Sequence, residues 1–157
     1  MTRRGWWWVG ILMLVGVVSG CGDDDHDHHH HHHDCGQSRE EERNDTLRTA
    51  NSLGEAFRGD CAVVKGSLSD PKDVDTFRFR VGERLTLAVT LDHDTAVDIA
   101  LQFVDGDTGD PIQDCGSGAG RVVCDVPLSG HSHGPAVAAV VSSVNGTGSY
   151  TLTLDAQ

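Results

Sequence analysis

The feature that most constrains the fold of this 157-residue chain is an alternation of apolar and polar side chains over much of its second half. A period of two places the apolar side chains on one face of an extended strand, so the pattern predicts half-buried β-strands. The expected strands are residues 77–81, 85–91, 97–103, 137–141 and 150–154, with weaker candidates at residues 62–68 and 121–126.

Turn-forming residues separate these segments at positions 81–83, 105–110, 116–120 and 145–146. Only residues 46–57 have a sequence that suits a short helix. Seven or so short strands without an intervening helical pattern predict an all-β domain, a single antiparallel, jelly-roll-like β-sandwich. We expect this domain to span residues 46–157.

Residues 1–20 have the organisation of a signal peptide. Arg3 and Arg4 precede an apolar run at residues 6–18, and the small residues Ser19 and Gly20 follow it. The run is shorter than the roughly 20 residues that a membrane-spanning helix needs, which favours a cleaved signal over a retained anchor helix. The two arginines fit an ordinary positive start and also a twin-arginine export signal.

The residues at the end of this segment, Val18, Ser19, Gly20 and Cys21, resemble the lipobox of bacterial lipoproteins. In that family the peptidase cuts before a cysteine that carries diacylglycerol, so the resemblance implies a lipid on Cys21 and a membrane as partner. The alternative is that Cys21 is the first cysteine of a secreted domain. Gly22 replaces the aspartate of the inner-membrane retention signal, which favours the outer membrane, on its periplasmic or surface-facing side.

Four further cysteines remain once Cys21 is assigned to lipid. An even number in an exported chain predicts two disulfides, whereas four free thiols would require a reducing compartment. Three pairings are possible. We favour Cys35 with Cys61 and Cys115 with Cys124, because the second pair brackets a glycine-rich turn.

The chain is acidic, with a formal net charge of −12. Removal of residues 1–20 would leave 137 residues, with 10 basic against 24 acidic side chains. Such a surface repels nucleic acid, so we expect no nucleic-acid partner. The charge favours cations, basic partners or simple solubility.

Residues 21–45 are expected to form a disordered tether, because they contain almost no apolar side chain. Within it, residues 23–34 hold seven histidines and five aspartates. Neighbouring imidazoles bind zinc, nickel or copper, so the tract is a candidate transition-metal site. The alternatives are a hydrophilic spacer and an introduced tag. The histidines are His26, His28, His29, His30, His31, His32 and His33.

Several motifs together resemble the bacterial pre-peptidase C-terminal domain. They are an acidic Asn-Asp-Thr opening at residues 44–46, Gly-Ser-Leu at 66–68, Asp-Val-Asp-Thr-Phe at 73–77 and Gly-Ser-Tyr-Thr-Leu at 148–152. The match covers about residues 40–154. It implies a compact jelly-roll sandwich of a kind commonly appended to secreted proteases, where it assists secretion, stability or substrate binding.

The resemblance also implies a calcium site. In calcium-binding relatives the ion lies between the acidic opening and the Asp-x-Asp strand, and calcium prefers six to eight oxygen ligands. The alternative is a solvated acidic linker with aspartates that cap turns. The matching residues are Glu40, Glu42, Asn44, Asp45, Asp70, Asp73 and Asp75.

Other motifs favour loops over chemistry. Residues 130–134 satisfy Gly-x-Ser-x-Gly, but a nucleophile elbow requires a strand-to-helix turn in an α/β sheet, so we expect no enzyme. His131 and His133 could bind a metal together with His93, although surface loop histidines are the simpler interpretation. The glycines of 116–120 and the aspartates of 105–110 suit turns rather than phosphate or EF-hand sites.

The function expected from the sequence is therefore a non-enzymatic, membrane-anchored binding or structural module, with calcium as a possible stabilising ion. Aromatic residues make up only 5% of the chain, which favours a protein ligand over a polysaccharide. The alternative function is a lipoprotein that buffers or senses transition metals through its histidine tract.

Overall fold

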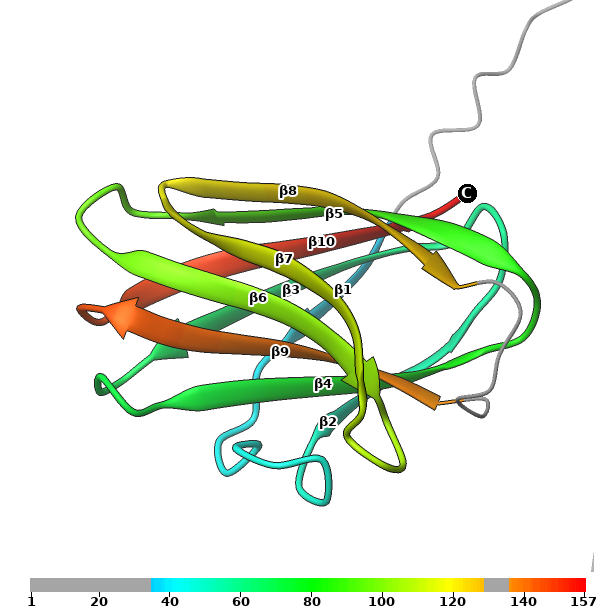
Figure 1. Ribbon diagram of the computed structural model, residues 1–157, viewed down its shortest axis with the longest axis horizontal. Coiled ribbons are helices and arrows are strands. Elements are labelled where there is room, and N and C mark those ends of the chain that lie inside the picture. Colours follow the sequence, from blue (N-terminus) through cyan, green and yellow to red (C-terminus); the bar gives the residue numbers. More distant parts are fainter. Residues whose placement is uncertain (1–34, 129–135) are drawn as a thin grey trace, which may run out of the picture. The chain divides into compact units, whose positions relative to one another are not determined.

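The structure is a computed structural model that describes residues 35–128 and 136–157, and these residues form a two-layer β-sandwich (Figure 1). The predicted signal peptide, the lipidation residue Cys21, the histidine tract and the Gly-x-Ser-x-Gly motif of residues 130–134 lie outside the described residues. Among the described residues, no helix is long and apolar enough to cross a membrane.

The two layers are sheets of five strands each, which we call sheet A and sheet B. Sheet A has the order β1 (Gly36–Arg39), β3 (Cys61–Leu68), β10 (Gly148–Ala156), β5 (Leu85–His93) and β8 (Arg121–Leu128). Sheet B has the order β2 (Asn51–Ala56), β4 (Val74–Val81), β9 (Ala136–Asn145), β6 (Asp98–Asp105) and β7 (Pro111–Ala119).

The strands pair antiparallel except at one edge, where β1 pairs with β3 and β2 pairs with β4 in parallel. The first four strands alternate between the sheets, and the chain reverses direction at each crossing. Strands two apart in sequence therefore run the same way and become neighbours. The sequence predicted an antiparallel sandwich, and the two parallel pairs at this edge differ from that prediction.

The core lies between the sheets and is built by the predicted alternation. In β5 the apolar side chains of Leu85, Leu87, Val89 and Leu91 are at most 2% exposed, while the intervening residues are half-buried. Phe77, Phe103 and Leu152 are fully buried from three other strands. Each such side chain stabilises the fold by about 1.5–3 kcal/mol relative to an exposed position. The weaker strand candidates at 62–68 and 121–126 are confirmed as β3 and β8.

Two expectations differ from the structure near the amino-terminal edge. The predicted helix at residues 46–57 is wrong: a turn closed by Thr46 and Thr49 is followed by strand β2. The ordered fold also begins before the predicted domain boundary at residue 46, because β1 hydrogen-bonds to β3 and Cys35 is bonded to Cys61. Strand β7, at the other edge, was not predicted either, and none of β1, β2 and β7 carries the apolar alternation that revealed the other strands.

Both disulfides have the pairing that the sequence favoured. Cys35–Cys61 fastens the start of β1 to β3, and Cys115–Cys124 joins β7 of sheet B to β8 of sheet A. Figure 1 shows β7 turning directly into β8 at that edge, with Gly120 in the turn at φ 86°. Two disulfides are typical of extracytoplasmic proteins.

Candidate functional site

The candidate site lies in the segment of residues 40–50, which crosses from β1 in sheet A to β2 in sheet B. This segment contacts the start of β4, where the backbone N–H of Thr76 donates a hydrogen bond of 3.0 Å to the carbonyl of Asn44. Arg43 has a φ of 77°, the only positive φ of a non-glycine residue in the described ranges. Such a conformation costs about 1 kcal/mol or more, and it turns the next residue inward.

Asn44 is fully buried by this turn. Its Nδ2 donates to Oδ1 of Asn51 at 3.1 Å, and Asn51 in turn exchanges hydrogen bonds with the backbone of Glu41. The Oδ1 atom of Asn44 has no hydrogen-bond donor among the described residues. A buried amide oxygen without a donor is costly, which makes it available as a ligand atom.

Three carboxylates converge beside this turn. Glu42 and Asp45 come from the crossing segment, and Asp73 comes from the residue before β4. One oxygen of each lies within 4.8 Å of the others, and the side chains of Glu42 and Asp45 are exposed. We call these three residues the carboxylate cluster. Such a spacing is compatible with a single cation between them.

Asp73 has a second role in the turn that leads into β4. Its Oδ2 accepts hydrogen bonds from the backbone N–H of Ser69 at 2.5 Å and from the Ser69 hydroxyl at 2.8 Å. Asp70 caps the same turn, accepting from the N–H of Lys72 at 2.7 Å. The structure therefore places Asp73 in the cluster and leaves Asp70 as a turn residue.

Asp75 is fully buried behind the cluster, at the start of β4. The Tyr150 hydroxyl donates a hydrogen bond of 2.7 Å to its Oδ2, whereas its Oδ1 has no donor among the described residues. Burial is the main cause that raises the pKa of Asp75 to about 6, helped by the neighbouring charges of Asp73 and Glu42 and opposed by the hydrogen bond from Tyr150. Burial also raises the pKa of Tyr150, so its hydroxyl stays protonated and remains a donor.

Glu40 follows β1 and lies beside Asp75. Its Oε2 accepts a hydrogen bond of 2.5 Å from the backbone N–H of Ser67. Burial raises the pKa of Glu40 to about 7, and the charge of Asp75 adds to the effect. Both Glu40 and Tyr150 approach the backbone of Gly66 so closely that a Cβ there would overlap their oxygens. The glycine of the Gly-Ser-Leu motif is thus required for this packing.

The residues that the sequence grouped as a calcium site therefore occupy two adjoining places. Glu42, Asp45 and Asp73 form the exposed carboxylate cluster, while Asn44, Asp75 and Glu40 present oxygens that are buried or half-buried next to it. A set of carboxylate and amide oxygens matches the ligands that calcium prefers. Two of these buried oxygens have no donor among the described residues, and two of the carboxyls have raised pKa values.

Sequence reasoning missed the part played by Tyr150 and Gly66. Tyr150 was counted as a core residue of a strand, and its ring does pack edge-on against Phe77 with centroids 6.4 Å apart. Its hydroxyl reaches Asp75 only because β10 and β4 lie opposite each other in the two sheets. A glycine inside a strand pattern is the one signal of close approach that the sequence contained.

Of the remaining motifs, the aspartates of 105–110 form a turn as expected, whereas residues 116–119 lie in strand β7 and only Gly120 lies in the turn that follows it. Asp105 Oδ1 accepts hydrogen bonds from the backbone N–H groups of Asp107 and Thr108, which closes the β6–β7 turn. His93 Nδ1 contacts the carbonyl of Asp94 at 3.0 Å. His131 and His133 lie outside the described residues, so the suggested three-histidine site is untested.

The similarity of this chain to known proteins is found in structure and not in sequence. The sequence matches no protein-family profile and no curated protein. Among solved structures, the pre-peptidase C-terminal domain of collagenase from Bacillus anthracis is similar over 69% of this chain and 94% of that domain, with 14% identity and a TM-score of 0.50.

A second solved structure is a periplasmic inhibitor of g-type lysozyme from Aeromonas hydrophila. It covers 69% of this chain and 97% of its own, with 13% identity and a TM-score of 0.47, at which the likeness carries no conclusion. The first similarity shows that the described part of this chain has the fold of a pre-peptidase C-terminal domain.

Proposed function

We propose that this chain is an exported lipoprotein that displays a non-enzymatic binding or structural module, and that calcium fastens the crossing between β1 and β2. The observation that carries the calcium proposal is a pair of buried oxygens without a donor, Asn44 Oδ1 and Asp75 Oδ1, next in sequence or within two residues of the carboxylates of the cluster. Oxygens placed this way are poorly satisfied without a cation.

The residues that would hold the ion come from both sides of the crossing. Glu42 and Asp45 supply exposed carboxylates, and Asp73 supplies the oxygen that does not bond to Ser69. Bound calcium would supply positive charge that offsets the repulsion among these acids. Because the ligands belong to the crossing segment and to β4, binding would stabilise the folded chain over the unfolded chain.

Calorimetry and thermal unfolding test the calcium proposal. We expect calcium to raise the Tm of the purified full chain, and Glu42→Gln with Asp73→Asn to abolish the rise. Asp125→Asn is the matched control, because Asp125 is an exposed aspartate on β8, outside the cluster. Equal Tm values with calcium and with a chelator, in a chain that is folded by circular dichroism, would refute it.

The envelope location rests on the signal-peptide pattern, the lipobox of residues 18–21 and the two disulfides. If it is right, mass spectrometry of the protein purified from bacterial membranes will give an amino-terminal peptide that begins at Cys21 and carries a lipid. The Cys21→Ser variant will then be released from the membrane. An intact Met1 on the mature protein would contradict the proposal.

The binding function is supported by the fold and by the acidic charge of the chain, which suits a basic protein partner. A photo-crosslinking amino acid placed at exposed positions of the described strands, in the anchored protein in cells, tests it. A specific protein adduct at some of these positions is expected. A chain that is anchored and folded but gives no adduct at any of them would not be a binding module.

A second candidate function is transition-metal handling by the seven histidines of residues 23–34. Calorimetry with zinc separates the two functions, because deleting residues 23–34 should remove zinc binding and leave calcium binding intact. Growth of cells that lack this segment in zinc-limited and zinc-excess media then decides whether the binding is used. Unchanged growth in both media would remove this candidate.

A further inference from the structure

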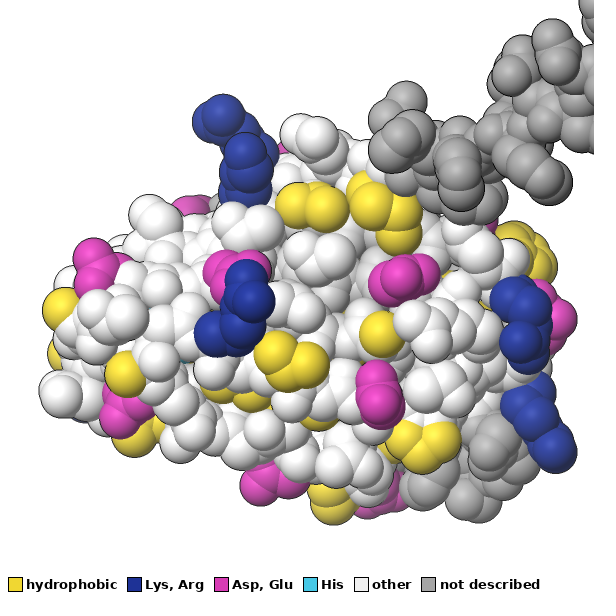
Figure 2. Space-filling model, turned by 90° about the horizontal axis from the view of Figure 1, so that it is seen from above, with side chains coloured by type: hydrophobic (Ala, Val, Ile, Leu, Met, Phe, Trp, Pro, Cys, Tyr) yellow, Lys and Arg dark blue, Asp and Glu magenta, His cyan; other side chains and the backbone are white. Residues whose placement is uncertain are grey.

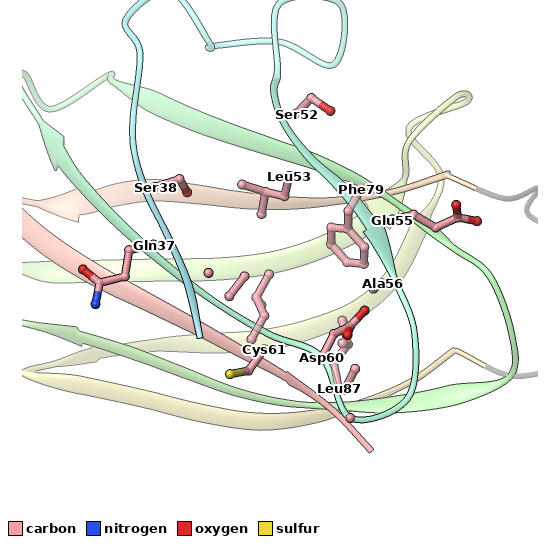
Figure 3. A pocket seen from close by; sticks show the side chains of 15 residues that line it. Gln37, Ser38, Ser52, Leu53, Glu55, Ala56, Asp60, Cys61, Phe79 and Leu87 are labelled. Carbon is pink, nitrogen blue, oxygen red and sulfur yellow. The ribbon is translucent and has the colours of Figure 1, made fainter. Parts of the chain in front are cut away.

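One edge of the sandwich contains a groove between β1 and β2, the strands that end sheets A and B. It encloses about 490 Å³, within the range of sites that bind ligands. Figure 3 shows the side chains of Leu53 and Phe79 lying between the two strands. Leu87 and Leu154 complete the apolar floor.

The groove exists because the inward positions of β1 hold small residues. Ser38 pairs with Val64, which is fully buried, and Gly36 pairs with Ala62, so positions 36 and 38 face the inside of the sandwich. In Figure 3 Ser38 points towards the groove and Gln37 away from it. The side chains of Ser38 and Gly36 are much smaller than that of leucine, so they leave most of this space unfilled.

Strand β2 turns an apolar side chain into the same space. Its pairing with β4 shifts register between Ser52 and Gly54, which leaves Leu53 as the extra residue of a bulge. Gly54 adopts a φ of 87° there. Bulges commonly redirect a side chain, and Leu53 here is half-buried, packing against the edge of the core while it lines the groove.

The outer edge of β1 offers backbone hydrogen-bonding groups. Glu40 N–H donates to the carbonyl of Lys65 in β3, so in this strand the even-numbered residues bond to β3. Because N–H and C=O groups alternate in direction along a strand, those of Gln37 and Arg39 face the groove side. No described strand pairs with this edge.

The charge around the groove selects the ligand. Among the described residues, Glu55 and Asp60 are the only ionisable side chains that line it, and both are acidic, on a chain whose net charge is −12. By contrast, the face seen in Figure 2 has scattered charges and small, separate apolar spots, with no gathered patch. The edge groove therefore combines apolar depth, free backbone groups and a charge of one sign.

We propose that this groove binds an extended segment of a partner protein, which pairs with the outer edge of β1, buries an apolar side chain at alternate positions over Leu53 and Phe79, and places basic side chains beside Glu55 and Asp60. This is strand addition to a sheet edge, in which the backbone supplies affinity and a pocket supplies specificity. The inference rests on the proposed function as a binding module and names its site.

The test uses the purified full chain and labelled nine-residue peptides. One peptide alternates valine and lysine, a second alternates valine and glutamate, and a third repeats the first with N-methyl groups on alternate amides. We expect the valine–lysine peptide to bind at least ten times more tightly than the other two. It should also slow amide hydrogen exchange at Gln37 and Arg39. Equal binding of all three peptides, or no binding at all, would overturn the proposal.

Two variants and their controls locate the site. Ser38→Leu fills the groove and Glu55→Lys reverses its charge, so each should weaken binding of the valine–lysine peptide at least tenfold. Ser149→Leu and Asp125→Lys make similar changes on exposed positions of β10 and β8 and should leave binding unchanged. Thermal unfolding checks that all four variants fold. Equal effects of variants and controls would overturn the assignment.

Crosslinking in cells separates failure of this inference from failure of the proposed function. Adducts at Gln37 that are lost in Ser38→Leu support the groove. Adducts found only at Thr90, on the outer face of sheet A, would overturn the groove and leave the chain a binding module.

Discussion

The two edges of the sandwich differ in how the chain crosses from one sheet to the other. At one edge the chain crosses between the sheets through the single turn residue Gly120, and the Cys115–Cys124 disulfide locks β7 to β8. At the other edge it crosses through residues 40–50, which are acidic and contain a strained Arg43, and β1 and β2 remain apart with a groove between them. The Cys115–Cys124 disulfide joins the two sheets at one edge, whereas Cys35–Cys61 at the other edge lies within sheet A, so the sheets are held together there by polar contacts.

The two edges also differ in how they are protected against pairing with another chain. Exposed sheet edges invite unwanted pairing, and proteins protect them by short strands, bulges, charges or closure. The β7–β8 edge is closed, whereas β1 is only four residues long and β2 is interrupted by a bulge. The open edge is thus limited in how many backbone groups it offers, while its groove keeps it selective for a side chain of suitable size and charge.

The largest expected effect comes from opening each edge by removing its disulfide. Cys35–Cys61 closes a separation of 26 residues and Cys115–Cys124 one of 9. By loop entropy their loss costs about 3.5 and about 2.6 kcal/mol of unfolding free energy, respectively. Denaturant unfolding of the two double cysteine-to-serine variants measures both. A larger loss of unfolding free energy on removing Cys115–Cys124 than on removing Cys35–Cys61 would contradict this expectation. It would mean that β1 contributes little to the stability of the folded state.

The next effect concerns Tyr150, whose hydroxyl is the sole donor to buried Asp75 in the described hydrogen bonds. Tyr150→Phe keeps the ring that packs on Phe77 and removes the hydroxyl donor from Asp75, so we expect a loss of about 1–3 kcal/mol. Denaturant unfolding measures the loss, with Thr153→Val on the same strand as control. A variant as stable as the parent would show that Asp75 is satisfied by another group.

A smaller effect is a pH dependence confined to the acidic crossing. Glu40 and Asp75 have pKa values raised to about 7 and about 6, from usual values of 4.5 and 3.8. The folded chain therefore holds more protons than the unfolded chain from about pH 4 to about pH 7, and stability falls as pH rises through this window. We expect the Tm in chelator to fall by a few degrees across it.

Calcium should reverse the slope, because a cation favours the ionised carboxylates. The variant Glu40→Gln should flatten the dependence of Tm on pH measured in chelator. The control Glu83→Gln, in the turn between β4 and β5, should not. A profile that rises with pH in chelator would contradict the assignment of buried, easily protonated carboxyls to this crossing.

The sequence predicted the central strands of this molecule far better than most of its edge strands, since β1, β2 and β7 were not predicted. Strands such as β5 carry an apolar side chain at every second position because both neighbours and the opposite sheet cover one face. Strand β1, with the sequence Gly-Gln-Ser-Arg, has no apolar residue, since nothing packs over its inner face. Apolar alternation in a sequence reflects the burial of one face of a strand. A strand whose inner face stays uncovered therefore does not show it.

The candidate site was predictable to a similar extent. Glu42, Asp45 and Asp73 were identified through resemblance to a family, and the fold brings them together. Glu40, Asn44 and Asp75 were identified in the same way, but the hydrogen bond from Tyr150 to Asp75 was not, because these two residues are 75 positions apart and meet only across the sandwich. A hydrogen bond between two strands of different sheets leaves no local pattern in the chain.

The smallest expected effect tests whether the open edge stores strain. Arg43 occupies a left-handed conformation that glycine adopts without cost, so Arg43→Gly should relieve the strain and raise the unfolding free energy by about 0.5–1 kcal/mol, reduced by the extra flexibility of the unfolded chain. Arg48→Gly, in the same segment at a negative φ, should destabilise by a similar amount. If Arg43→Gly is destabilising as well, the crossing is held by contacts of the arginine side chain, and the two edges differ in chemistry but not in strain.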